Sequence, residues 1–320
     1  MKIRSMVVPF ALLSFAMAAR GQTCTASISD VDFGTPNLLS TTATDVSATL
    51  TVNCTSVPLL ASVKVCPSLS EGTGGAVGGI RLMEGPGNQA LSYQLFQDAT
   101  RAQGWGASDN LTLGTVPFLS LPGGLTGTAR TTRTIYARLF GNQNTVAPGT
   151  FLSEFESTET AFQYSSYYFS TSENCSGWVG TRVVRPTFTV SAELSSYCRV
   201  STADIAFGSV GVLAAAITAN GKLTLACTRS TPYVIYLNGG LSGAPPTARR
   251  MTRNAEAVLY GLYRDVARTQ AWGDVSTPGS GLAGTGTGGD QVLTVYGRIA
   301  PQTTPSPGAY SDRIIVTVVY

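Results

Sequence analysis

Histidine is absent from this 320-residue sequence, and charged side chains make up only 12% of it. Catalysis or zinc binding that depends on an imidazole is therefore excluded. Once Lys2 and Arg4 of the first segment are set aside, basic and acidic residues are nearly equal in number. The chain therefore has no basic field that would attract nucleic acid. Helical periodicity is also scarce, and Thr, Ser, Gly and aromatic residues predominate, which favours strands joined by Gly and Pro turns.

Residues 1–18 have the pattern of an export signal. Lys2 and Arg4 give a positive start, residues 6–15 are apolar, and Ala16-Met17-Ala18 fits a small-x-small cleavage site. The apolar run is too short to span a bilayer comfortably, and no later segment is long and apolar enough to do so. We therefore expect an exported protein.

One stretch of the sequence occurs twice, at residues 93–106 and 260–273. Tyr, Leu, an aromatic residue, Asp, Arg, Gln, Trp and Gly recur at matching positions without a gap. Further matches lie outward in the same order, among them the Phe-Gly pairs at 33–34 and 207–208. The chain is therefore a tandem duplication whose two copies share one fold.

Six cysteines in an exported chain are expected to form disulfide bonds. Two pairs occupy equivalent positions of the repeat, and the two remaining cysteines have no counterparts in the second copy. The expected bonds are Cys24–Cys54, Cys198–Cys227 and Cys66–Cys175.

Short segments of alternating apolar and polar residues recur along both copies. Apolar side chains occupy every second position from Val46 to Cys54, and Val63 and Val65 flank an outward Lys64. About seven such strands per copy, separated by turn signals, predict an all-β protein of two tandem immunoglobulin-like β-sandwiches. We expect the first domain at residues 19–196 and the second at 197–320.

The two copies differ at their ends. The second copy finishes in an apolar, β-branched segment at 313–320, so we expect its sandwich to lack a strand and to leave an edge open. In the first copy the chain continues into a strand-like segment at 187–194. That segment is either the equivalent of 313–320 or an added strand, and in both cases it can complete the first sandwich. The expected edge residues are Ile314, Ile315, Val316, Val318 and Tyr320.

Four marks recur in the same order in both copies: the opening Cys…Phe-Gly, the strand ending in Cys54 or Cys227, the Tyr-x-Leu-aromatic-x-Asp…Trp-Gly stretch and a late Pro-Gly-x-aromatic turn. Together they resemble the spore coat protein U domain family, and most of all the two-domain tip adhesins of archaic (Csu-type) chaperone–usher pili. The resemblance implies pilin-type sandwiches that lack a strand. A periplasmic chaperone supplies that strand first, and an adjacent pilin subunit supplies its N-terminal strand later. It also implies an outer-membrane usher as a partner and a location at the cell surface, in the pilus.

Cleavage near Ala18 would leave only a few residues before Cys24, whereas a donor strand needs about ten residues or more. We therefore expect the chain to accept a strand and to have none to donate, which places it at the tip of the pilus. The second domain is expected to be the pilin domain and the first the exposed adhesin domain.

Apolar loops of the first domain are the expected surface-binding site. Residues 116–122 and 164–178 are rich in apolar side chains where connecting segments are usually polar, and exposed apolar patches often mark adhesion sites. The resemblance favours attachment to abiotic or host surfaces. The alternative is that these side chains fold inward as a lid. The expected site residues are Val116, Pro117, Phe118, Leu119, Leu121, Tyr167, Tyr168, Phe169 and Trp178.

Two other functions remain open, a lectin-like tip that binds glycans through Trp and Tyr faces and a structural coat or pilin subunit. Glu154, Glu156 and Glu159 are better explained as a solvated strand face than as the carboxylates of a glycoside hydrolase. The Gly-rich run at 284–289 lacks the strand-to-helix context of a nucleotide site. We expect no enzymatic activity, no cofactor and no metal.

Overall fold

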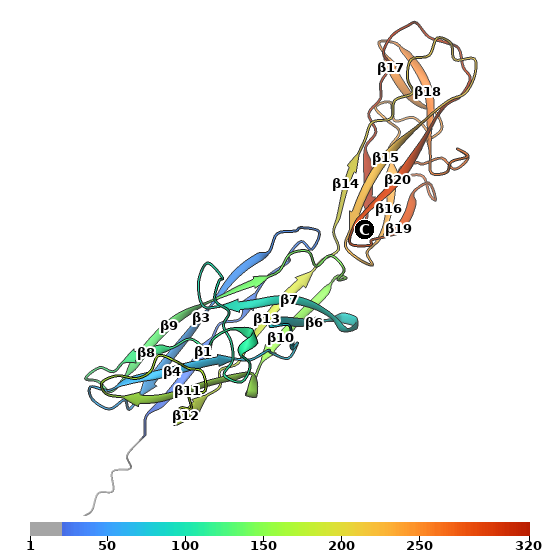
Figure 1. Ribbon diagram of the computed structural model, residues 1–320. Coiled ribbons are helices and arrows are strands. Elements are labelled where there is room, and N and C mark those ends of the chain that lie inside the picture. The colour runs from blue at the N-terminus through green and yellow to red at the C-terminus, as the bar shows by residue number, and fades with distance from the viewer. Residues whose placement is uncertain (1–20) are drawn as a thin grey trace, which may run out of the picture.

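Residues 21–320 are described by the computed structural model, and the expected signal peptide at 1–18 lies outside this range. The strands form two elongated β-sandwiches joined end to end (Figure 1). Helical structure in the described range is limited to the single-turn 3-10 helices η1 (Pro86–Asn88), η2 (Leu111–Leu113) and η3 (Ser157–Glu159). None of it is long enough to span a membrane. The predicted all-β, two-sandwich fold is confirmed.

Two sheets build the first sandwich. The larger runs in the order β1–β3–β9–β7–β6–β10–β13–β2, with β5 beside β6, and the smaller in the order β12–β11–β4–β8. The larger contains β1 (Thr23–Ile28), β2 (Val31–Asp32), β3 (Thr44–Thr55), β5 (Ala76–Val77), β6 (Ile80–Gly85), β7 (Gln89–Phe96), β9 (Ala129–Leu139), β10 (Gly149–Phe155) and β13 (Phe188–Leu194). The smaller contains β4 (Ser62–Leu69), β8 (Leu119–Pro122), β11 (Thr160–Tyr167) and β12 (Arg182–Val184).

The second sandwich is smaller. Its sheets run in the orders β14–β15–β20–β18–β17 and β19–β16–β21. They contain β14 (Cys198–Thr202), β15 (Ile217–Cys227), β16 (Pro232–Leu237), β17 (Arg249–Arg253), β18 (Glu256–Tyr263), β19 (Leu282–Thr285), β20 (Asp290–Ile299) and β21 (Val316–Val319). The two sandwiches meet where the Asn144 side chain donates a hydrogen bond of 2.8 Å to the Gly288 carbonyl.

Side chains along each strand point alternately into the core and toward the surface. On β3, Ala48, Leu50, Val52 and Cys54 are buried, and the residues between them are more exposed. The tryptophans of the repeat, Trp105 and Trp272, are both fully buried. Each indole donates a hydrogen bond of 2.8 Å to a backbone carbonyl of the facing sheet. The repeat therefore preserves the core of each sandwich.

A buried arginine, which the sequence patterns did not single out, also recurs at equivalent positions. Arg81 pairs in register with Tyr93, and Arg249 with Tyr260. Both guanidinium groups donate hydrogen bonds to several backbone carbonyls, including that of Trp105 or Trp272. Burial lowers the pKa of Arg81 to about 10. Carbonyl oxygens thus take the place of a carboxylate partner and fasten the Trp-Gly loop to the sheet.

Three disulfide bonds hold the described chain. Cys24–Cys54 joins directly opposed residues of β1 and β3, and Cys198–Cys227 joins directly opposed residues of β14 and β15. Cys66–Cys175 joins β4 to the insertion between β11 and β12. These are the three bonds expected from the sequence, two from the repeat alignment and the third from the remaining cysteines, and the described residues contain no free cysteine.

Candidate functional site

The strand β13 has no counterpart in the described part of the second sandwich. In the first sandwich β4 lies between β11 and β8, and in the second β16 lies between β21 and β19. β21 is therefore the equivalent of β11. The bridge between Thr252 and Ser311 likewise repeats the pairing of Glu84 with Leu152. β13 is thus an added strand, and the alternative that equated it with 313–320 is wrong.

β13 completes the core of the first sandwich from within the chain. It pairs antiparallel with the whole of β10 and parallel with β2. Its inward side chains, Phe188, Val190, Ala192 and Leu194, are buried, and the Phe188 ring stacks on Phe155 with centroids 4.4 Å apart. They cover Phe33 and Phe151, which are buried as well.

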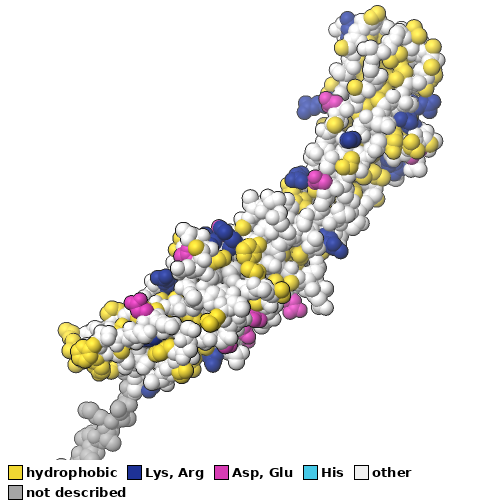
Figure 2. All heavy atoms as spheres, viewed as in Figure 1, with side chains coloured by type: hydrophobic (Ala, Val, Ile, Leu, Met, Phe, Trp, Pro, Cys, Tyr) yellow, Lys and Arg dark blue, Asp and Glu magenta, His cyan; other side chains and the backbone are white. Residues whose placement is uncertain are grey.

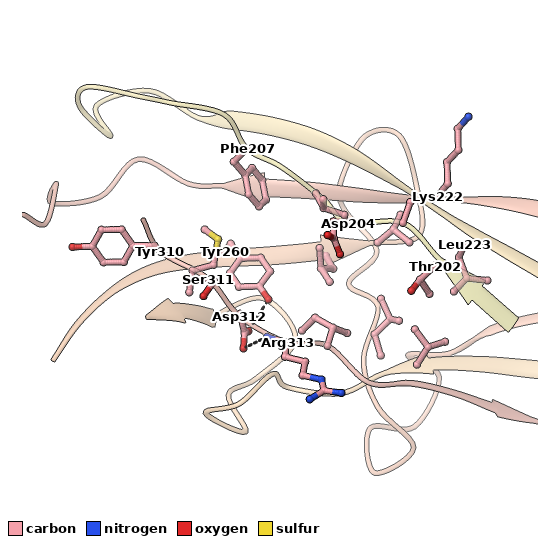
Figure 3. Close-up of a pocket in the computed structure, with 18 residues that line it drawn as sticks. Thr202, Asp204, Phe207, Lys222, Leu223, Tyr260, Tyr310, Ser311, Asp312 and Arg313 are labelled. Atoms are coloured by element: carbon pink, nitrogen blue, oxygen red, sulfur yellow. Dashed lines mark hydrogen bonds between the residues drawn. The ribbon is translucent and has the colours of Figure 1, made fainter. Parts of the chain in front are cut away.

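The equivalent place in the second sandwich is an open groove of about 640 Å³. Figure 3 shows Phe207 and Tyr260 projecting toward this space, whereas the Lys222 side chain extends away from it. Phe207 and Tyr310, the counterparts of Phe33 and Phe151, are only half-buried. The apolar lining comprises Ile205, Phe207, Leu223, Leu237, Met251, Tyr260, Leu262, Val295, Tyr310, Ile314 and Val316.

Asp312 lies in the groove with its carboxylate fully engaged. Its Oδ2 accepts a 2.7 Å hydrogen bond from the Tyr260 hydroxyl, and its Oδ1 accepts bonds from the backbone N–H groups of Leu241 and Arg313. Burial, with the Asp312 hydrogen bond as the second cause, raises the pKa of Tyr260, so the phenol stays protonated and donates. This pair braces the groove and offers no activated nucleophile.

The predicted edge residues divide between two faces. Ile314 and Val316 line the groove, and Val318 is half-buried on the same face. Ile315 and Tyr320 are more than half exposed and lie outside the groove lining. That these five residues form the edge stays a prediction. Ile315 points away from the groove because side chains alternate along an extended chain, and Tyr320 is exposed beyond the end of β21.

A second candidate site lies at the end of the first sandwich away from the second. Pairing of Ser62 with both Pro122 and Tyr167, and of Cys54 with Ala129, brings three connections together there. Figure 2 shows yellow side chains gathered at this end. We give the name apolar tip to five exposed apolar residues of these connections: Leu59 (61% exposed), Leu60 (79%), Leu125 (84%), Tyr168 (58%) and Phe169 (100%).

Residues 116–122 do not form the exposed apolar loop that the sequence suggested. Leu119 and Leu121 lie on β8 and point into the core, and Pro117 is buried as well. Val116 and Phe118 are half-buried. The prediction of surface exposure is wrong for Pro117, Leu119 and Leu121, because the segment alternates as an edge strand with its leucines inward.

Of the predicted site residues in the insertion after β11, some are also exposed and others half-buried. Tyr168 and Phe169 are exposed, in agreement with the prediction, whereas Tyr167 and Trp178 are half-buried. Leu59, Leu60 and Leu125 were missed. The available signal was local: large apolar residues beside Pro58 and within the Gly-rich turn 123–127, where turns are normally polar.

These features define a class of protein with two β-sandwiches, the first complete and the second lacking one strand. The model of the Spore Coat Protein U domain matches residues 10–158 and 185–317, and the chain belongs to this family. Protein U of Myxococcus xanthus is 36% identical over 108 residues, a match that spans 31% of this chain and 59% of Protein U.

Two solved structures of pilus proteins align with most of this chain. A chain of the CsuC–CsuE chaperone–tip adhesion subunit complex of Acinetobacter baumannii aligns with a TM-score of 0.55 and 15% identity, over 93% of this chain and 100% of that chain. The CupB6 tip adhesin of Pseudomonas aeruginosa aligns over 92% of this chain and 93% of that one, with a TM-score of 0.42 and 12% identity. The first of these likenesses supports a shared overall fold.

Proposed function

We propose that this chain is the tip adhesin subunit of an archaic chaperone–usher pilus, a binding protein and not an enzyme. The observation that carries the proposal is the groove of the second sandwich, which stands open where β13 closes the first. Membership of the family and the fold shared with the CsuC–CsuE complex support it. The chain is exported through the periplasm and displayed at the cell surface.

The second sandwich is the pilin domain, and its groove accepts a strand. A periplasmic chaperone occupies it first, and the N-terminal strand of an adjacent subunit replaces the chaperone at the outer-membrane usher. β13 indicates what the groove accepts. Phe188, Val190 and Ala192 oppose Phe155, Ser153 and Phe151. The donor strand therefore carries a large apolar side chain opposite Ile314, a medium one opposite Asp312 and a small one opposite Tyr310.

A peptide that copies residues 187–195 tests this acceptor role. It is expected to bind the exported full chain with a stoichiometry of one and to slow hydrogen exchange in residues 308–314, because each large side chain buried contributes about 1.5–3 kcal/mol. The matched control has the same composition with the inward and outward positions exchanged. Equal binding of both peptides, or of neither, would contradict the assignment.

The first sandwich is the adhesin domain, and it attaches to abiotic or host surfaces through the apolar tip. Side chains this exposed gain free energy by leaving water against an apolar surface, at about 25 cal/mol per Å². Their position at the end of the molecule away from the acceptor groove leaves them free when a donor strand is bound (Figure 1).

Leu125→Ser combined with Phe169→Ser is expected to abolish attachment of piliated cells to polystyrene and to leave pilus assembly unchanged. Val77→Ser combined with Val266→Ser is the control, since both valines are 70% exposed but lie outside the tip. Attachment that survives the tip change, or falls equally in the control, would refute this site.

A lectin-like tip remains the alternative candidate, and it depends on Trp178 presenting a free ring face. That ring is half-buried and its face lies 4.4 Å from the Lys64 ammonium, which favours the apolar mode. Inhibition of attachment by free sugars would instead favour the glycan-binding alternative.

A further inference from the structure

Lys64 is a buried lysine that neither proposed site accounts for. It lies on β4 between Val63 and Val65, which point into the core, so its own side chain leaves the opposite face of the sheet. The sequence therefore predicts a solvated lysine. In the structure it is only 1% exposed, because the insertion between β11 and β12 covers this face.

The Lys64 ammonium is held by neutral groups. It donates hydrogen bonds to the backbone carbonyls of Ser172, at 2.6 Å, and of Asn174, at 2.9 Å. The Trp178 ring lies 4.4 Å away and the Phe118 ring 5.8 Å away. The ion pairs of the described residues do not include Lys64. Carbonyl dipoles and aromatic faces therefore compensate the buried charge.

These contacts fix the chain immediately after the apolar tip. On the entry side, Tyr167 pairs with Ser62, and its hydroxyl is 2.7 Å from Ser120 Oγ. On the exit side, the first fixed group is the Ser172 carbonyl on Lys64. Tyr168 and Phe169 therefore lie in a short connection, residues 168–171, that is anchored at both ends.

The Cys66–Cys175 disulfide is a second anchor, but it lies further along the chain. If the disulfide were the only exit anchor, the free connection would extend from 168 to 174. The entropy of a loop rises with its length, so the exposed rings would sample more positions. Ordering them against a surface would then oppose binding, whereas a loop held in one shape avoids that cost.

We infer that Lys64 is a positioning residue that presents Tyr168 and Phe169 at the apolar tip. The inference rests on the proposed attachment of the first sandwich to surfaces. Lys64 itself touches no surface; it acts through the carbonyls of Ser172 and Asn174. Phe118 and Trp178, expected from the sequence to bind surfaces, are the aromatic walls around its ammonium.

Lys64→Met tests the inference in the exported full chain. Methionine keeps the length and the apolar stem but cannot donate hydrogen bonds. We expect amide exchange in residues 170–176 to accelerate about tenfold or more, because a hydrogen bond to a charged group contributes at least that factor. Attachment to polystyrene beads should weaken about tenfold. Lys222→Met is the control, since Lys222 is an exposed lysine of the second sandwich.

Two further variants separate positioning from simple stability. Lys64→Arg keeps the charge and the donors and should restore attachment at least in part. Should Lys64→Met fail to fold, Trp178→Leu removes one aromatic wall without altering a strand and should also speed exchange and weaken attachment.

Faster exchange with unchanged attachment would overturn the inference, and so would unchanged exchange with folded protein. The proposed attachment through the apolar tip has its own test. It is refuted when Leu125→Ser combined with Phe169→Ser leaves attachment unchanged. Loss of attachment in that tip variant but not in Lys64→Met would refute the positioning role alone.

Discussion

Phe188→Ala is expected to destabilise the first sandwich and to leave the second unchanged. Phe188 is 4% exposed, and its ring stacks on Phe155 at 4.4 Å with an interplanar angle of 15°. Truncating a buried Phe to Ala removes its transfer free energy and leaves a cavity, which together cost about 3–5 kcal/mol. In the first sandwich β13 fills the place that stands open in the second. This change should therefore shift the first sandwich toward an open form like that of the second.

The assay is hydrogen exchange of the full chain across a guanidinium series. Amides of β10 report the first sandwich, because β10 pairs with β13 along its whole length, and amides of β15 report the second. Thr189→Ala is the matched control: its side chain lies on the other face of the same strand and should cost less than about 0.5 kcal/mol. A loss below about 1 kcal/mol for Phe188→Ala, or equal loosening of both sandwiches, would refute the reasoning.

Three further predictions concern the groups that hold the sandwiches together. Hydrogen bonds from the Thr100 side chain and from the backbone of Gln103 and Ala102 lower the pKa of Asp98 from 3.8 to about 2. The turn they hold should therefore be intact above about pH 4 and loosen as the pH falls toward 2, which amide exchange in this turn would detect; loosening at neutral pH would contradict it. Arg249→Met should destabilise the second sandwich by more than about 3 kcal/mol in denaturant melts, because it leaves several buried carbonyls without a donor; a loss below about 1 kcal/mol would contradict it. Replacing both Cys66 and Cys175 with Ala should lower the stability of the first sandwich by about 3–5 kcal/mol in the same melts, since the bond closes a long loop; an unchanged midpoint would contradict it.

The duplication made the fold predictable. Trp105 and Trp272 recur in register, and so do the cysteines that open each copy, so the sequence alone indicated two sandwiches and their disulfide bonds. The role of β13 was not predictable to the same degree. Its alternating pattern shows a strand, but only its pairing with β10 and β2 shows that this strand fills a place left open in the second sandwich.

The apolar tip was harder to predict because exposure depends on which neighbours cover a segment. The apolar residues around Leu119 suggested an exposed loop, since the segment lies between predicted strands and contains Pro117 and Pro122. An edge strand tolerates Pro at its end, and β8 is such a strand. For Lys64 the error has the opposite direction. Its place on an outward face predicted exposure, but an insertion more than 100 residues away in sequence covers it.

The central claim is that the second sandwich is completed by a strand from another molecule. The most direct measurement is amide exchange in residues 308–314 and in residues 203–207, with and without a peptide that copies residues 187–195. The account predicts that the peptide protects both segments, which lie on opposite sides of the groove, and leaves β3 unchanged. Equal exchange with and without saturating peptide, or strong protection of both segments in the unbound monomer, would contradict the claim.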